Sequence, residues 1–153
     1  MRNLHNSYFI KGDPLKVARL FDCDIIEADI IKGLKLSHSW RPFGMYCHGD
    51  LEKRYLEKFQ LSKILYIEFK SGNRSMQEEL FEALKRSNIK TVLLFAKDRN
   101  WFMKLFCKRE RNMNEFYNKY KNTLRMSIFK MTDYRKTVEV VNIDLYKKSI
   151  WNF

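Results

Sequence analysis

The sequence predicts an α/β protein with a mixed central sheet flanked by helices. Two apolar runs, 64–69 and 91–96, have the length and the aliphatic and aromatic content of buried strands. Between them, apolar residues recur at helical spacing from Met76 to Leu84. A strand, a helix and a strand of these lengths normally form a right-handed crossover with parallel strands.

The central helix has recognisable ends. Ser75 is the expected N-cap, and Glu78 three residues later completes a capping box. Asn88 follows the last apolar position and tolerates the left-handed conformation in which many helices end.

Two further helix starts precede this unit. Asp13 caps a helix in which Pro14 takes the first position. A second start is predicted at Asp24, because Glu27 follows at capping-box spacing and apolar residues recur at helical spacing as far as Leu34.

Three other segments are less regular. Residues 8–10 fit either a short strand or an apolar tether, and residues 40–44 indicate a turn. Residues 51–60 are dense in charged side chains and fit either an exposed β-ribbon or a short helix.

The last third of the chain predicts a helix followed by a hairpin. Residues 100–121 are basic and aromatic and read as mostly helical, with a break near 112–114. Alternating apolar residues at 124–128 and again at 138–145 indicate two strands around a turn at 132–135.

The chain of 153 residues is 45% hydrophobic and has only five Gly and two Pro, which predicts a single domain over residues 1–153. Its core is expected at about 24–97, with the basic helix and hairpin at 99–153. No apolar run approaches the roughly 20 residues of a membrane span, and the N-terminus lacks the apolar core of a signal peptide. We therefore expect an intracellular, cytoplasmic protein (in the host cytoplasm if the chain is viral) with no membrane partner.

Cysteine usage argues against two kinds of site. Cys23, Cys47 and Cys107 are odd in number and far apart, which does not suit a disulfide framework. The spacing of these cysteines and the nearby histidines is also unlike that of a zinc site.

The chain is strongly basic, with 30 Lys and Arg against 18 Asp and Glu and a net charge of +12. Such an excess favours a polyanionic partner, usually nucleic acid. A lysine-rich composition that serves solubility is the alternative.

Glu68 and Lys70 end the apolar run 64–69 and, two residues apart on a strand, share a face. Buried charges are unfavourable unless they are paired, hydrated or metal-bound. If Asp50 lies on a strand that pairs with 64–69, Asp50 and Glu68 would hold Mg²⁺, which polarises a phosphate and activates water. Lys70 would orient that water. A plain salt bridge between Glu68 and Lys70 is the alternative.

Two more residues are candidates for this site. Glu27, at the start of its expected helix, would add a carboxylate, although a capping role would explain it equally well. Gln77, in the first turn of the central helix, would hydrogen-bond Lys70 or the substrate.

The segment from Ile67 to Val92, with Glu68-Phe-Lys70, Gln77 and the returning strand, resembles the core of the PD-(D/E)xK nuclease superfamily. It is particularly similar to the virus-type replication-repair nuclease (VRR-NUC) and Holliday-junction resolvase branches. The resemblance covers about residues 24–97 and implies a restriction-endonuclease-like core. It implies that Glu68 is the second metal carboxylate, Lys70 the catalytic lysine and Gln77 the helix glutamine.

The same resemblance implies that Asp50 is the first metal aspartate and Glu27 the glutamate of the N-terminal helix. Asp50 departs from the pattern because Gly precedes it instead of Pro, so Asp24 and Asp29 are alternatives. His48 would be a ligand in a site like that of cap-snatching endonucleases, or else simply a surface residue.

The predicted function is that of a Mg²⁺- or Mn²⁺-dependent nuclease, acting as an endo- or exonuclease on DNA more than on RNA. A homodimer would suit such an enzyme. Phosphate contacts are expected from five basic residues, Arg74, Lys104, Lys108, Arg109 and Arg111. Trp101 and Phe102 would either stack on bases or lie in the core. The alternatives are a catalytically inactive protein that binds nucleic acid, and a viral or phage protein that binds a host factor.

Overall fold

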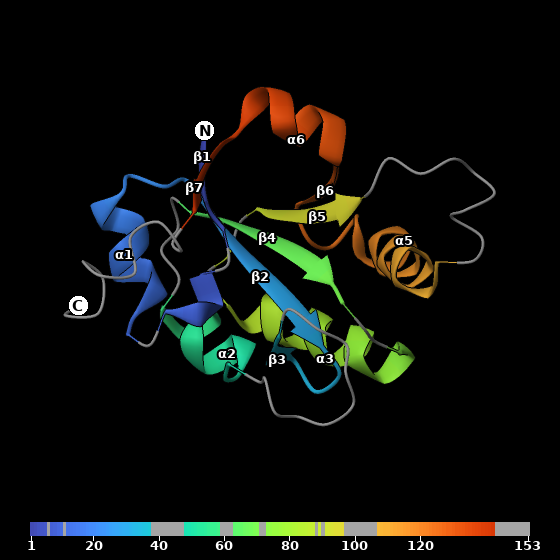
Figure 1. Ribbon diagram of the computed structural model, residues 1–153. Coiled ribbons are helices and arrows are strands. Elements are labelled where there is room, and N and C mark those ends of the chain that lie inside the picture. The colour runs from blue at the N-terminus through green and yellow to red at the C-terminus, as the bar shows by residue number, and fades with distance from the viewer. Residues whose placement is uncertain are drawn as a thin grey trace.

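The computed structural model shows a curled parallel sheet flanked by helices (Figure 1). The residues that it describes are 1–5, 7–10, 12–37, 48–58, 63–70, 73–87, 89, 91–96 and 107–142.

Within this described part, the sheet has seven strands, six of them in the order β6-β5-β4-β2-β1-β7. Every neighbouring pair along that path is parallel, and the short β3 pairs antiparallel with β2. The strands are β1 (Arg2–His5), β2 (Ile25–Ile31), β3 (Lys35–Leu36), β4 (Ile64–Phe69), β5 (Val92–Ala96), β6 (Met126–Lys130) and β7 (Glu139–Asn142).

The helices follow the strands along the chain. They are α1 (Pro14–Leu20), α2 (Leu51–Arg54), α3 (Arg74–Arg86), α5 (Lys108–Tyr120) and α6 (Met131–Thr137), with short 3-10 turns at Ser7–Phe9 and Leu56–Lys58. Among the described helices, none combines the length and the apolar character needed to cross a membrane.

The curl of the sheet follows from its connections. In a flat sheet, the edge strands β6 and β7 would be about 24 Å apart, because neighbouring strands are about 4.8 Å apart. They are joined by α6, whose seven residues span only about 10 Å. The two edges therefore bend toward each other on the side where α6 lies (Figure 1).

The two faces of the sheet carry different cores. The outer face, defined as the one that α1, α2, α3 and α5 cover, bears the larger cluster of buried aliphatic and aromatic residues. The face toward α6, called the α6 face below, bears a smaller cluster around Ile25, Tyr66, Tyr134 and Val138. Along β2 and β4, the charged side chains lie on the α6 face, whereas their neighbours on the outer face are apolar.

The central prediction is confirmed. β4, α3 and β5 form a parallel strand–helix–strand unit, with Tyr66 opposite Leu93. The start of α1 is also confirmed, since the Asp13 side chain accepts a hydrogen bond from the backbone N–H of Leu15 at 2.9 Å. The predicted cap of α3 is two residues late: Asn73, not Ser75, accepts from Met76.

The predicted helix from Asp24 to Leu34 is wrong, and the segment forms β2. Its local capping pattern is outweighed by tertiary burial, because six of its seven residues are buried between parallel neighbours. Asp24 accepts a hydrogen bond from the backbone N–H of Arg2 at 3.1 Å and caps no helix. Gly33, with φ of 74°, makes the turn that leads to β3.

The C-terminal hairpin is replaced by a different arrangement. β6 pairs with β5 and β7 pairs with β1, so that the two strands lie at opposite ends of the strand order. The expected turn at 132–135 is part of α6, and α5 continues through 112–114 without a break. Residues 51–58 resolve the earlier alternative in favour of short helices.

Several expectations concern residues outside the described part of the chain. These are the turn at 40–44, Cys47, Asn88, Trp101, Phe102, Lys104 and the segment from 143 onward.

Candidate metal centre

Four charged residues of β2 and its neighbour β4 point to the α6 face. Side chains alternate along a strand, so Glu27 and Asp29 of β2 share this face with Glu68 of β4 and Lys70 just after it. The parallel register places Asp29 directly opposite Glu68. Ala28, between the two acids of β2, lies in the outer-face core.

The three carboxylates converge. One oxygen each of Glu27, Asp29 and Glu68 can be chosen so that all three lie within 4.8 Å of one another. Asp29 is fully buried, and Glu27 is 4% exposed. Such a concentration of negative charge in a partly dry environment is unfavourable without a cation. Carboxylate oxygens are the ligands that hard divalent cations such as Mg²⁺ and Mn²⁺ prefer, so the group fits a metal ion.

Lys70 supplies one positive charge to this group. Its Nζ lies 2.9 Å from Oε2 of Glu68 and 3.2 Å from Oδ2 of Asp29. Burial opposes the charged form of Lys70, but the carboxylates of Asp29 and Glu68 outweigh burial and raise the pKa of the lysine. Burial, together with the charge of Asp29, raises the pKa of Glu68 despite Lys70.

His5, at the end of β1, borders the group. Its Nδ1 lies 2.8 Å from Oε2 of Glu27, and its side chain is 34% exposed. Burial alone would lower the pKa of His5, but the hydrogen bond and charge of Glu27 raise it above the ordinary value. His5 is therefore an ionisable group that is more exposed than the carboxylate it contacts.

Neutral side chains hold the carboxylates in place. The Tyr8 hydroxyl donates to Oδ2 of Asp29 at 2.7 Å, and Nδ2 of Asn3 donates to Oε2 of Glu27 at 2.9 Å. Burial and the nearby charge of Asp29 raise the pKa of Tyr8, so its hydroxyl keeps the proton that it donates. Ligands fixed by such partners are pre-organised for a metal.

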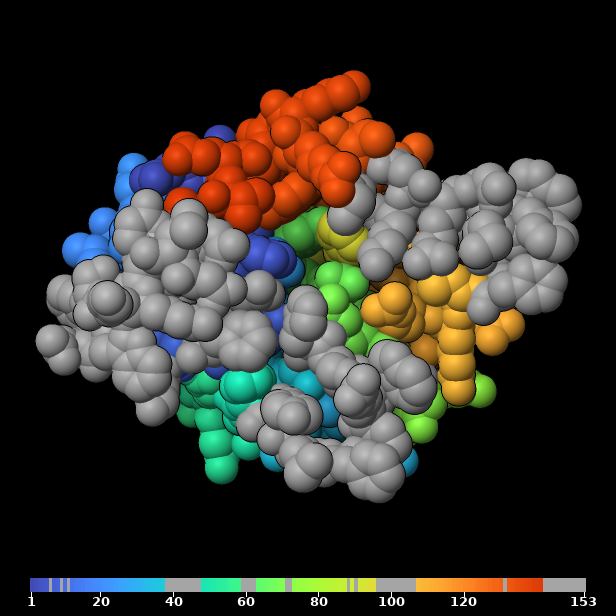
Figure 2. Space-filling view, in the orientation of Figure 1, coloured from blue at the N-terminus to red at the C-terminus, as the bar shows by residue number. Residues whose placement is uncertain are grey.

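The first turn of α5 lies next to Glu68 at the border of the site. Nη1 of Arg109 lies 3.9 Å from Oε1 of Glu68, and the Arg109 side chain is about one-third exposed. Figure 2 shows atoms in the green of β4 at the surface between α6 and α5. This region of the sheet is thus not wholly covered in the view shown.

Two predicted site residues lie elsewhere. Asp50 forms an isolated bridge and an ion pair with Lys35, and it stands directly before α2. The strand that pairs with β4 on this side is β2, which explains why Asp29 takes the place expected of Asp50. Gln77 is buried on α3, and its Nε2 lies 3.4 Å from Oε2 of Glu115, not beside Lys70.

Among the described residues, His48 is not one of those whose ligand atoms converge. Its ring centroid lies 5.7 Å from that of Tyr8, and its backbone N–H donates to the carbonyl of Leu36. Burial and the charge of Arg54 lower the pKa of His48.

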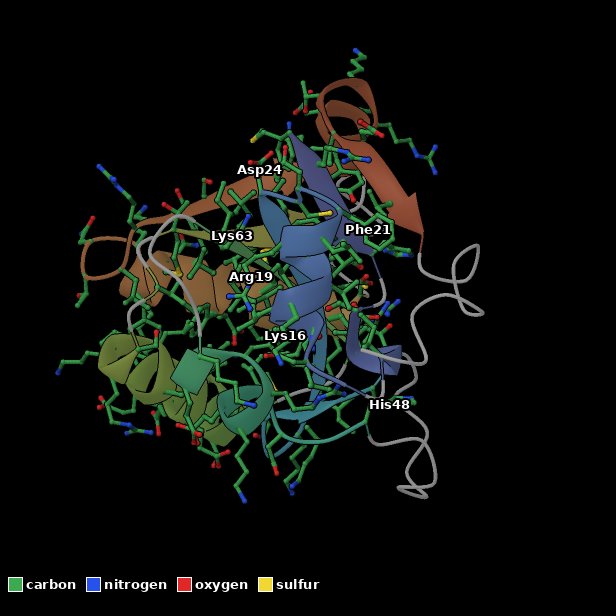
Figure 3. All side chains as sticks on the ribbon, turned by 90° about the vertical axis from the view of Figure 1, so that its left-hand side faces the viewer. Lys16, Arg19, Phe21, Asp24, His48 and Lys63 are labelled. Atoms are coloured by element: carbon green, nitrogen blue, oxygen red, sulfur yellow. The ribbon has the colours of Figure 1, made fainter. Side chains whose placement is uncertain are left out.

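The predicted phosphate-binding residues are only partly gathered at the site. Arg109 borders it, while Lys108 and Arg111 are exposed on α5. Arg74 is exposed on α3 and lies 3.4 Å from Glu78. Other cations come from a different side of the molecule, where Figure 3 labels Lys16 and Arg19 of α1 and Lys63 before β4.

The sequence gives no indication of His5, and it groups Glu27 with Glu68, as the structure does, but on a helix instead of the strand β2. A usable signal was present in Glu27-Ala-Asp29, which repeats the alternation of Glu68-Phe-Lys70 within another β-branched, apolar run. His5 carried no comparable signal, because the four-residue strand that it ends is too short to show a clear periodicity.

Comparison with known proteins found no similarity on which to assign a family. No family model matches the chain, and neither the curated proteins nor the solved structures gave a match.

Proposed function

We propose that the chain cleaves phosphodiester bonds with a divalent cation, Mg²⁺ or Mn²⁺, bound by Glu27, Asp29 and Glu68. The observation that carries the proposal is the convergence of the three carboxylate oxygens within 4.8 Å. When bound, the metal would polarise a phosphoryl oxygen and favour ionisation of a coordinated water.

His5 is the best placed general acid or base. Its Nδ1 is held by Glu27, which leaves Nε2 as the nitrogen able to exchange a proton with a substrate oxygen or a water. The carboxylate fixes the ring orientation, as a second hydrogen bond does for many catalytic histidines.

Lys70 and Arg109 would stabilise negative charge on the phosphate of the substrate. Lys70 is held between Asp29 and Glu68, where its ammonium group would offset negative charge that develops on phosphorus. Arg109, more exposed and next to Glu68, would bind a phosphate oxygen as the substrate enters.

The proposed substrate is nucleic acid, DNA more than RNA, and the net charge of +12 supports a polyanionic substrate of this kind. Phosphate contacts made by the exposed Lys108 and Arg111 would be independent of base sequence.

A second candidate substrate is a small phosphodiester. Asp29 is fully buried and the Glu68 side chain is only 13% exposed, so a rigid duplex would not bring its backbone to these groups without local opening. A single-stranded end or a small diester would reach them more easily.

The test measures cleavage of labelled single-stranded DNA, duplex DNA, RNA and bis(p-nitrophenyl) phosphate with Mn²⁺ or with EDTA. Metal-dependent cleavage that falls at least about 100-fold in Asp29→Asn and in Glu68→Gln is expected, since even outer partners of metal ligands are worth 10- to 100-fold. The matched control is Glu78→Gln, an exposed acid on α3 that should retain full activity.

Which of these substrates the protein cleaves distinguishes nucleic acid from a small phosphodiester as its substrate. Cleavage that survives both substitutions would rule out this metal site. Nucleic-acid binding without cleavage would support an inactive binding protein instead.

A further inference from the structure

Tyr66 places an unused hydroxyl on the α6 face. The residue is 1% exposed, and its Oη has no hydrogen-bond partner among the described residues. A buried hydroxyl without a partner destabilises the fold, so native structures rarely retain one without a reason.

Packing does not explain the hydroxyl. The Tyr66 ring stacks on Tyr134, with centroids 5.3 Å apart and planes 14° apart, and it meets the edge of Phe95 at 5.6 Å. A phenylalanine would make the same ring contacts without burying an unpaired oxygen. The hydroxyl is therefore unfavourable for the fold as it stands.

The position of Tyr66 connects it to the carboxylates. It lies directly opposite Glu27 in the β2–β4 register and shares a face with Glu68, two residues further along β4. A second polar atom on the same face, Oδ1 of Asn3, is also buried without a partner among the described residues. The nitrogen of that amide already donates to Glu27.

We infer that the Tyr66 hydroxyl is a positioning group that donates a hydrogen bond to an oxygen bound at the carboxylate cluster. That oxygen belongs either to a metal-coordinated water or to a phosphate. The inference rests on the proposed function, because the oxygen is brought there by the metal or the substrate. A donor aimed at such an oxygen fixes its orientation and stabilises its negative charge.

The experiment compares wild type with Tyr66→Phe by thermal unfolding in three conditions: EDTA, Mn²⁺ alone, and Mn²⁺ with inorganic phosphate. Without metal, the variant should unfold at the same temperature as wild type or higher, because it loses an unsatisfied hydroxyl. A smaller shift with Mn²⁺ alone identifies the partner as metal-bound water. An unchanged Mn²⁺ shift with a smaller added shift from phosphate identifies a phosphate oxygen.

Kinetics supply the second readout. With bis(p-nitrophenyl) phosphate, kcat/KM should fall about 10-fold, as expected for the loss of one hydrogen bond to a charged oxygen. The matched control is Tyr55→Phe, whose buried hydroxyl bonds Ser7 within the fold. That variant should unfold at a lower temperature but keep both ligand shifts.

Two results would overturn the inference while leaving the metal centre in place. Ligand shifts and kcat/KM equal to those of wild type would show that the Tyr66 hydroxyl meets no bound oxygen. A lower unfolding temperature in EDTA with unchanged ligand shifts would show an ordinary structural bond. A wild-type protein that gains no stability from Mn²⁺ would instead refute the metal centre itself, and this inference with it.

Discussion

The two faces of the sheet are built by alternate residues of the same strands, yet along β2 and β4 one face stays apolar while the other becomes charged. On the outer face, Ala28, Ile30 and Ile67 continue an apolar core to the carboxyl ends of the strands. On the α6 face, the apolar cluster around Ile25 and Tyr66 gives way to charged residues toward those ends.

The two faces therefore have different roles: the outer face stabilises the fold, and the α6 face holds the carboxylates of the candidate site. The outer face can supply most of the apolar burial, because four of the five helices described pack there. The α6 face can then hold buried carboxylates, which weaken a fold that has no cation to offset them. The carboxyl ends of parallel strands are also where ligands bind in many α/β proteins. Substitutions on the two faces should therefore have different consequences.

The largest effect is expected on the α6 face from His5→Asn. Asparagine can still hydrogen-bond Glu27 but cannot transfer protons, so kcat should fall about 100-fold or more. The stabilisation by Mn²⁺ should change little, because His5 is not among the three carboxylates. Steady-state kinetics and thermal unfolding measure the two quantities, and undiminished kcat would exclude His5 as the acid or base.

Lys70→Met tests whether the positive charge of Lys70 offsets the repulsion between the buried carboxylates. Removing the cation between Asp29 and Glu68 should lower the free energy of unfolding of the metal-free protein by about 3 kcal/mol. Mn²⁺ should recover part of this loss, since it replaces the missing positive charge. Urea unfolding with EDTA and with Mn²⁺ gives both values.

The control is Lys16→Met on α1, an exposed position where a change within about 0.5 kcal/mol is expected. If Lys70→Met were as stable as wild type in EDTA, the carboxylates would not depend on the lysine for charge compensation.

Ile67→Ala tests the outer face. The side chain is fully buried, and its truncation should cost about 2–4 kcal/mol through lost burial and a residual cavity. The affinity for Mn²⁺, measured by isothermal titration on folded protein, should be unchanged. A large loss of metal affinity would show that the two faces are coupled more strongly than their separate cores suggest.

The smallest expected effect is a difference in pKa between two histidines, measured by NMR titration of the metal-free protein. His5 should titrate above its ordinary pKa of 6.5, because the hydrogen bond and charge of Glu27 outweigh burial. His48 should titrate below 6.5, because burial and Arg54 disfavour its charged form.

The two shifts have opposite consequences for stability. The contribution of His5 is complete below pH 6.5 and is lost as the pH rises through its folded pKa. The contribution of His48 is present above pH 6.5 and is lost as the pH falls through its folded pKa. Titration of both near 6.5 would contradict the assigned contacts.

Part of the site could be predicted because its signals are local. Glu68 and Lys70 lie two residues apart at the end of a strand whose apolar pattern is clear. The structure places Nζ of Lys70 2.9 Å from Oε2 of Glu68. From the sequence, Asp29 is only an alternative to Asp50, because a short apolar run such as the one around it fits a helix or a buried strand.

Other parts depended on pairing that no local pattern encodes. β1 has four residues and pairs with two strands remote in sequence, so neither the strand nor the role of His5 could be recognised beforehand. Likewise, the segment after β6 reads locally as a turn and a strand, but β7 finds its partner at the other end of the chain.

By itself, the sequence determined the β4–α3–β5 unit, the cap of α1, and the Glu68–Lys70 pair, because capping and periodicity act over a few residues. The tertiary structure alone decided that β2 is a strand, that β7 joins β1, that Glu27 and Asp29 meet Glu68, and that His5 contacts Glu27. Those outcomes depend on burial and on contacts between distant segments, whose energies exceed local conformational preferences.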